Sequence, residues 1–232
     1  MKNVFVQTAN VKNFITTMKE AEGNLGDPSL LVFYGQAGRG KTTAARYFAA
    51  QEGWTYARAL RDWSGLWMLQ DICFELKIDP IPNRKKACFE AIVSTLRKNP
   101  GIVIIDEADK LSPANLERVR DLADLTYVPF ALVGENLIVH KMKVERRIWS
   151  RTLRAVEFGP ITAQDVLFFA KQAADMALTA QQAELLRDAA DGDFRLVSRD
   201  VKRLEGLWNT NRGVKISDEM VKTAIRQGLK GK

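Results

Sequence analysis

The stretch that decides the fold is Leu30-Leu31-Val32-Phe33-Tyr34, followed at once by Gly35-Gln36-Ala37-Gly38-Arg39-Gly40-Lys41-Thr42. The apolar run indicates a buried strand, and the residues after it have the G-x-x-x-x-G-K-T spacing of a phosphate-binding loop, the P-loop. Glycines let successive backbone N–H groups curl round a phosphate, and the helix that follows points the positive end of its dipole at the same anion. The sequence therefore predicts a nucleoside triphosphate site.

Within the P-loop, two side chains have distinct predicted roles. Lys41 would reach the β- and γ-phosphates of ATP, and the hydroxyl of Thr42 would bind Mg²⁺. A glycine-rich turn with a surface lysine is the alternative interpretation. The predicted nucleotide-binding residues of this segment are Gly35, Gln36, Ala37, Gly38, Arg39, Gly40, Lys41, Thr42 and Thr43.

A second apolar run, Ile102-Val103-Ile104-Ile105, ends in acidic residues. Consecutive β-branched residues are typical of a parallel strand that is covered on both faces. Asp106, at the carboxyl end of this strand, is placed to hold Mg²⁺, and Glu107 is placed to act on the attacking water as a general base. The pair favours ATP hydrolysis over nucleotide-kinase chemistry. A strand that ends in a solvated acidic turn is the alternative.

Composition limits the classes of function. The chain has 232 residues, 46% of them hydrophobic, which allows one good core and a small second lobe. Its net charge of +7 points to a polyanionic partner. Cys73 and Cys88 lack metal-ligand spacing and are expected to be buried thiols, and the single histidine, His140, argues against histidine-based chemistry. No membrane span and no signal peptide can be recognised, so we expect a cytoplasmic protein without membrane contact.

Strand and helix patterns alternate along the first two thirds of the chain. Strands are predicted at about residues 30–34, 54–58, 101–106, 128–134 and 153–158, and helices at about 8–22, 42–51, 66–76, 84–98 and from 113 onward. This alternation predicts an α/β fold with a parallel five-stranded sheet. Beyond Gly159-Pro160 only helical patterns occur. We therefore predict a P-loop ATPase domain over residues 1–159 and a lid of three or four helices over residues 160–232.

The P-loop, the acidic strand, a polar residue after the next strand and the helical lid together resemble the AAA+ ATPases. The resemblance implies a sensor I residue that contacts the attacking water or the γ-phosphate, with Asn136 as the first candidate and Glu135 as the second. It implies an arginine finger, Arg147 or Arg151, that acts on the nucleotide of a neighbouring subunit. It also implies a sensor II arginine in the lid, Arg195. A polar turn, a basic helix end and an exposed basic stripe are the respective alternatives.

Within that family the chain is similar to the DNA-transposition ATPases of the phage Mu B, TnsC and TniB type. The similarity rests on Phe5-Val6-Gln7-Thr8-Ala9-Asn10-Val11, on Ser150-Arg151 and on Phe158-Gly159-Pro160. It implies an ATP-dependent helical homo-oligomer, a filament or ring, that coats double-stranded DNA without sequence preference. This oligomer would deliver the DNA to a transposase and activate it, and ATP hydrolysis would then dismantle it. Phage Mu B proteins carry an amino-terminal helix-turn-helix region, for which there is no room before Thr8.

Without that region, the ATPase core itself would have to bind DNA through phosphate contacts. The resemblance places Arg58 and Arg61, after the second strand, at the pore of related filaments. Lys110 and the run Arg84-Lys85-Lys86 are further candidates. Two other functions stay open. A helicase loader or origin-recognition-like ATPase would have a helicase as its partner, and an ATP-dependent regulatory switch would not bind DNA.

Overall fold

The computed structural model describes residues 1–2, 4–26, 29–210 and 215–229 and divides the chain into two compact units. The sheet unit comprises Asn13–Gln36 and Lys41–Phe158. The lid unit comprises Met1–Lys12, Ala37–Gly40 and Gly159–Lys232, so it includes the amino-terminal segment and the tip of the P-loop. The predicted domain limits, 1–159 and 160–232, stay a prediction.

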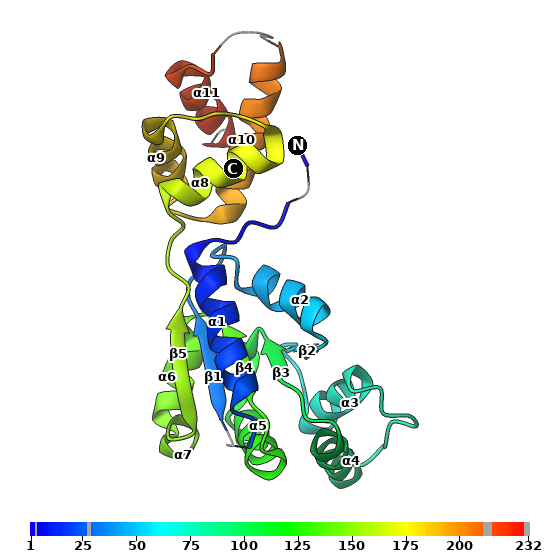
Figure 1. Cartoon of the computed structure of the whole chain (residues 1–232). Helices are drawn as coiled ribbons and strands as arrows, with labels where there is room; N and C mark the ends of the chain where they lie inside the picture. Colours follow the sequence, from blue (N-terminus) through cyan, green and yellow to red (C-terminus); the bar gives the residue numbers. More distant parts are fainter. Residues whose placement is uncertain (3, 27–28, 211–214, 230–232) are drawn as a thin grey trace. The chain divides into compact units, whose positions relative to one another are not determined.

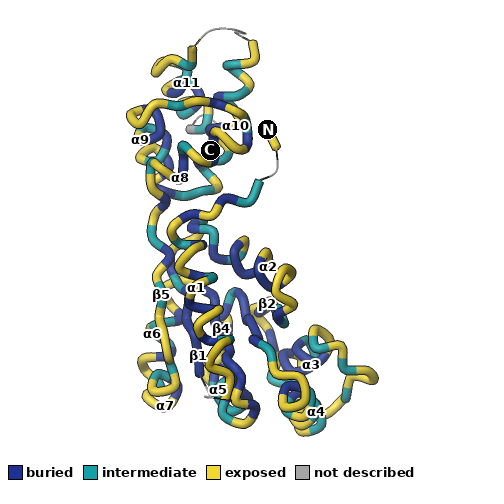
Figure 2. The backbone as a smooth tube through the Cα atoms, viewed as in Figure 1, coloured by how far each residue is buried: buried dark blue, intermediate teal, exposed yellow. Residues whose placement is uncertain are grey.

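The sheet unit is built on a parallel five-stranded sheet with the strand order β2-β3-β4-β1-β5 (Figure 1). The strands are β1 (Leu30–Tyr34), β2 (Thr55–Arg58), β3 (Val103–Asp106), β4 (Phe130–Gly134) and β5 (Thr152–Glu157). Figure 2 shows the inner strands β1, β3 and β4 as buried, whereas the edge strand β5 is largely exposed. The predicted α/β fold with five parallel strands is confirmed, because the apolar runs are the strands covered on both faces.

Helices precede β1 and connect the strands that follow. They are α1 (Ala9–Gly23), α2 (Lys41–Glu52), α3 (Gly65–Glu75), α4 (Lys85–Lys98), the 3₁₀ helix η1 (Ala108–Lys110), α5 (Pro113–Thr126), α6 (Asn136–Val144) and α7 (Arg146–Trp149). The hydroxyl of Ser112 accepts a hydrogen bond from the N–H of Asn115, so α5 begins at Pro113, where the sequence predicts a helix. Helices α6 and α7 were not predicted, because they are short and bury few apolar residues. No helix in the described ranges has both the length and the apolar content that crossing a bilayer needs.

Both cysteines lie in the core of the sheet unit. Cys73 in α3 and Cys88 in α4 are fully buried free thiols. The Sγ of Cys73 donates to the carbonyl oxygen of Cys88 at 3.7 Å. Burial, together with the neighbouring Cys88, raises the pKa of the Cys73 thiol to about 12. The prediction of buried thiols is confirmed.

The described part of the lid unit holds four helices, α8 (Ala163–Ala174), α9 (Ala180–Ala189), α10 (Phe194–Thr210) and α11 (Asp218–Leu229). Capping boxes at Thr162 and Thr179 fix the starts of α8 and α9. In α10, Val197, Val201 and Leu204 follow one another at helical spacing and are all buried at 0% exposure. Val6 of the amino-terminal segment packs in the same core. The structure therefore confirms the predicted helical lid, and the residues it describes there form four helices.

Candidate functional site

The P-loop joins β1 to α2, as predicted. Gly35 has a φ of 150°, and a Cβ there would lie 2.4 Å from the carbonyl oxygen of Phe158, so only glycine fits. The Nζ of Lys41 donates to the carbonyl oxygens of Gly35 and Gln36, each at 2.7 Å. Burial lowers the pKa of Lys41, and nearby carboxylates, Glu135 first among them, oppose that shift. The loop therefore holds a buried amine at the start of a helix, where a phosphate group binds well.

Asp106, at the end of β3, is 2% exposed and lies beside the start of α2. Its Oδ1 accepts hydrogen bonds from Thr42 Oγ1 at 3.3 Å and from the N–H of Glu107 at 2.9 Å. A carboxylate and a hydroxyl this close are hard oxygen ligands, which suit Mg²⁺ when phosphates and water complete its shell. In the described ranges no cluster of three or more His, Cys, Asp or Glu could bind a metal by itself. The residues present therefore fit an ion that Thr42, Asp106 and a nucleotide would hold together.

Tyr56 is a site residue that the sequence analysis did not identify. Its hydroxyl donates to Oδ2 of Asp106 at 2.7 Å. Burial, followed by this hydrogen bond, raises the pKa of Tyr56 far above its ordinary value, so the phenol stays a donor at neutral pH. The sequence shows only a tyrosine in a short strand. It does not show that this strand lies next to the acidic strand β3.

Glu107, the predicted general base, has a left-handed backbone with a φ of 57°. A residue other than glycine pays about 1–2 kcal/mol for that conformation, and such strain is found mostly at functional sites. Arg58 Nη2 lies 3.1 Å from Oε1 of this carboxylate, and Lys110 Nζ lies 3.1 Å from Oε2. Burial alone would raise the pKa of Glu107, but the hydrogen bonds from Lys110 and Arg58 outweigh it and lower the pKa. Glu107 is therefore ionised, as a general base must be.

Two of the three residues predicted to contact DNA, Arg58 and Lys110, thus form ion pairs with Glu107, the predicted general base. The side chains of Arg58 and Lys110 are 56% and 34% exposed, so both can also be reached from solvent. Arg61 is exposed in the turn between β2 and α3, and the further candidates Arg84-Lys85-Lys86 are exposed at the start of α4. The structure brings Arg58 and Lys110 together on the carboxylate of Glu107. Their role in DNA binding stays a prediction.

The two sensor I candidates lie where β4 passes into α6. Glu135 is the residue before α6, and Asn136 is its first residue; both are exposed. The N–H of Glu135 donates to Oδ1 of Asp109 at 2.9 Å, a contact that orients this turn against η1. Of the carboxylates that act on the pKa of Lys41, Glu135 has the largest effect. The charge of Glu135 therefore favours the protonated form of Lys41, and the sensor I assignment stays a prediction.

The arginine-finger candidates lie at the opposite edge of the sheet. Arg147 is exposed in α7, and the carbonyl oxygen of Arg151 accepts a hydrogen bond from the N–H of Leu30. Strand β1 leads from Leu30 to Gly35, and that many residues of strand span about 16 Å. The Nε of Arg151 donates to Oδ1 of Asp124 at 2.9 Å, away from the P-loop. Arg151 cannot reach the P-loop of its own chain, so a catalytic role would have to be in another copy.

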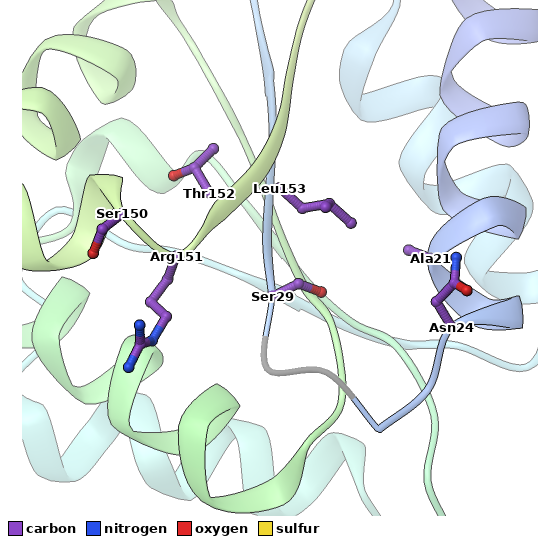
Figure 3. Close-up of a pocket in the computed structure, with 7 residues that line it drawn as sticks. All are labelled: Ala21, Asn24, Ser29, Ser150, Arg151, Thr152 and Leu153. Carbon is purple, nitrogen blue, oxygen red and sulfur yellow. The ribbon is translucent and has the colours of Figure 1, made fainter.

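A cavity of about 410 Å³ adjoins Arg151 at the amino ends of β1 and β5. It is lined by Ala21, Asn24, Ser29, Ser150, Arg151, Thr152 and Leu153. Figure 3 shows the side chain of Arg151 pointing away from α1. Because the P-loop and the acidic residues lie at the carboxyl ends of the strands, this cavity is separate from the predicted nucleotide site.

The tip of the P-loop is held within the lid unit. The carbonyl oxygen of Gly38 accepts a hydrogen bond from the N–H of Phe194 at 3.0 Å, and a Cβ on Gly38 would lie 2.0 Å from a carboxylate oxygen of Asp193. Arg39 is 6% exposed, and its guanidinium donates to the carbonyl oxygen of Asp191. The side chain of Arg39 is thus engaged with the lid. If Arg39 contacts a phosphate as predicted, the donor would be its backbone N–H and not its side chain.

Arg195, the predicted sensor II residue, lies in the first turn of α10. Its side chain is 67% exposed, and its Nε lies 3.8 Å from Oδ1 of Asp193. Arg199 and Lys202 are exposed on the same face of the helix. The geometry of the lid unit therefore agrees with both interpretations, a sensor II arginine and an exposed basic stripe, and the assignment stays a prediction.

A family profile described as an AAA domain matches residues 25–142, which include the P-loop, Asp106, Glu107 and both sensor I candidates. The chain belongs to the AAA+ ATPase family. The ATP-dependent target DNA activator B of Escherichia phage Mu is 29% identical to this AAA+ ATPase in an alignment of 233 positions that covers 96% of the chain and 73% of the relative. The protein of the same name from Escherichia phage D108 has the same identity and coverage. The predicted resemblance to the DNA-transposition type is confirmed.

Solved structures show the same fold. The ORC2 protein of Aeropyrum pernix, in ADPNP and ADP complexes, superposes with a TM-score of 0.70 at 16% identity and covers 97% of this chain and 68% of its own. Cdc6p of Pyrobaculum aerophilum gives a TM-score of 0.70 at 17% identity, covering 96% of this chain and 69% of its own. The RuvB branch migration motor of Thermotoga maritima gives 0.56 at 21% identity, covering 96% and 70%. At these identities the likeness shows the AAA+ fold alone.

Proposed function

We propose that this AAA+ ATPase hydrolyses ATP with Mg²⁺, binds double-stranded DNA without sequence preference as a helical oligomer, and delivers that DNA to a transposase that it activates. It would act in the cytoplasm, that of a bacterial host if a phage encodes it. Similarity to a target DNA activator along 96% of the chain supports the role in transposition. The observation that carries the proposal is the carboxylate of Glu107, held between two cations that are themselves candidates for DNA contact.

In the proposed reaction each residue has a limited task. The P-loop N–H groups and Lys41 hold the phosphates, and Thr42 and Asp106 would hold Mg²⁺, which when bound neutralises charge on the phosphate oxygens. Glu107 takes a proton from the water that attacks the γ-phosphorus. An arginine of a neighbouring copy, Arg147 or Arg151, stabilises the charge that develops on the phosphoryl group. Sensor residues Glu135 or Asn136 and Arg195 would contact the same group.

In this proposal DNA binding affects ATP hydrolysis through the ion pairs of Glu107. Arg58 and Lys110 each hold one oxygen of its carboxylate, and together they lower its pKa and therefore its basicity. A DNA phosphate is a competing anion for both cations, and their partial exposure leaves them within its reach. Phosphate binding would draw them away and release Glu107 to act on water. We therefore expect duplex DNA to stimulate ATP hydrolysis.

The test compares ATP hydrolysis with and without random-sequence duplex. The parent should hydrolyse ATP faster with DNA. Arg58→Ala should raise the rate without DNA, because Glu107 loses one of its two partners, and should reduce the stimulation. Arg226→Ala is a matched control, since it removes an exposed arginine that pairs with Glu219 on the lid and should behave as the parent. Equal parent rates with and without DNA would contradict the coupling.

Partner identity needs a separate experiment. Retention of a purified transposase, but not of a replicative helicase, on the ATP-bound oligomer supports the transposition role, and the reverse supports a helicase loader. A gel shift with random duplex separates both from a regulatory switch, which would leave the DNA unshifted. Negative-stain microscopy with ATP and DNA tests the helical oligomer in the same samples.

A further inference from the structure

The hydroxyl of Tyr56 is bonded to a carboxylate of the candidate metal site. It donates to Oδ2 of Asp106 at 2.7 Å, while Oδ1 of the same carboxylate lies 3.3 Å from Oγ1 of Thr42. We propose that Tyr56 is a positioning residue for Mg²⁺, which fixes the Asp106 carboxylate so that Oδ1 and the Thr42 hydroxyl can share the ion. This inference rests on the proposed Mg²⁺-dependent ATPase function.

Strand register explains why a tyrosine can do this. Strands β2 and β3 are parallel, with Tyr56 opposite Ile104 and Arg58 opposite Asp106. The hydroxyl must therefore reach two residues along the neighbouring strand, about 6.6 Å. The length of a phenol spans that distance, whereas serine, threonine and asparagine side chains are too short.

The same strand serves both acidic residues. Tyr56 and Arg58 are two residues apart, so their side chains leave β2 on one face. Tyr56 donates to Asp106, and Arg58 pairs with Glu107. The short strand β2 thus supplies a partner for Asp106, which would bind the metal, and a partner for Glu107, which would take the proton.

Because Asp106 is buried, its hydrogen bond from the hydroxyl of Tyr56 is hard to replace. Asp106 is 2% exposed, so water cannot readily replace a lost partner. On Oδ1 it has two donors, Thr42 Oγ1 and the N–H of Glu107, and on Oδ2 the donor among the residues that the structure describes is Tyr56. An ion shared with Thr42 would displace one of the Oδ1 contacts, and the Tyr56 bond would then keep the carboxylate from rotating. Removing a group that orients a metal ligand weakens metal binding by roughly 10- to 100-fold.

The variant Tyr56→Phe keeps the ring and deletes the hydroxyl. Mn²⁺, a paramagnetic replacement for Mg²⁺, is titrated into protein saturated with ADP, and free Mn²⁺ is measured by electron paramagnetic resonance. We expect Mn²⁺ to bind about tenfold more weakly to Tyr56→Phe than to the parent, the lower end of the usual range because the ligand itself remains. Tyr127→Phe, which makes the same change at an exposed tyrosine after α5, should bind Mn²⁺ as the parent does.

A second measurement separates positioning from damage to the fold. ADP affinity in EDTA, together with a thermal melt, should be the same in the parent and in Tyr56→Phe. If ADP affinity in EDTA falls by as much as Mn²⁺ affinity, Tyr56 has only a structural role and the inference is wrong. If Mn²⁺ affinity is unchanged while the parent binds Mn²⁺ with ADP, the inference alone fails. A parent that binds no Mn²⁺ with nucleotide overturns both this role and the proposed function.

Discussion

The two edges of the sheet hold their charged side chains in different ways. At the carboxyl ends of the strands Lys41 and Asp106 are 8% and 2% exposed, and each has more than one hydrogen-bond partner. At the amino end of β5 the side chain of Arg151 is 48% exposed and pairs with Asp124. Buried charges need fixed partners, whereas an exposed ion pair is worth little and exchanges readily. The carboxyl-end edge therefore has its charged side chains fixed in place before a ligand binds. At the amino-end edge, the guanidinium of Arg151 can exchange Asp124 for an anion of another molecule.

Lys41→Ala tests the buried edge and should have the largest effect. We expect ATP binding to be lost, because the β- and γ-phosphates lose a point charge that the fold has already desolvated. Equilibrium dialysis measures this, with the exposed Lys86→Ala as the control. Unchanged ATP affinity in Lys41→Ala would remove the basis for the nucleotide site.

Glu107→Gln should leave ATP bound while hydrolysis falls by roughly 10²–10⁴, as expected when a general base is lost. The neutral amide also no longer pairs ionically with Arg58 and Lys110, so filaments on DNA should last longer in negative-stain images. Glu90→Gln, an exposed glutamate of α4, is the control. Turnover at the parent rate would leave Glu107 with a purely structural role.

Arg151→Ala tests the exposed edge. ATP should bind normally and be hydrolysed slowly, with a smaller loss than in Glu107→Gln because Arg147 remains nearby. Mixing with Lys41→Ala, which retains both arginines, should restore some activity in mixed oligomers. No recovery at any ratio, once mixing is verified, argues against a role in trans.

Asp124→Asn is the matched control for that experiment. It keeps Arg151 and removes its ion-pair partner, so hydrolysis should be at least as fast as in the parent. The free energy of unfolding should fall by no more than about 1 kcal/mol, the usual value of an exposed ion pair. If Asp124→Asn lost as much hydrolysis as Arg151→Ala, the activity would depend on the Arg151–Asp124 ion pair and not on a guanidinium that is free to reach another copy.

The double variant Arg58→Ala/Arg61→Ala should have the smallest effect, mainly on DNA affinity, beside the higher rate of hydrolysis without DNA that the loss of Arg58 from Glu107 should cause. Affinity for all duplex sequences should fall alike, and the slope of log K against log salt should shrink by about one unit for each phosphate contact removed. ATP binding without DNA should be unchanged. A thermal melt must accompany the titration, because Trp54 and Trp63 nearby are both 6% exposed and pack in the core. A stable variant with the parent slope would move the DNA surface elsewhere, with Lys110 and then Arg84-Lys85-Lys86 next to be tested.

The sequence alone determined the features whose information is local. A continuous apolar run predicted strand β1, and the spacing of Gly35, Gly40 and Lys41 predicted the loop that follows, because both patterns lie within one short segment. The acidic end of β3 was recognised in the same way. The buried stripe of α10 followed from helical periodicity.

Only the tertiary structure decided which partners these residues have. Tyr56 reaches Asp106 because β2 lies beside β3, although α3 and α4 separate these strands in the chain. Arg151 pairs with Asp124 across 27 residues of sequence, and Arg39 with Asp191 across 152. Local patterns fix the period of an element and the face it buries, but not the register of two strands or the loop that meets a side chain. For the buried side chains of Asp106 and Arg39 such partners also satisfy polar groups that water cannot reach, and that requirement is met only in the folded chain.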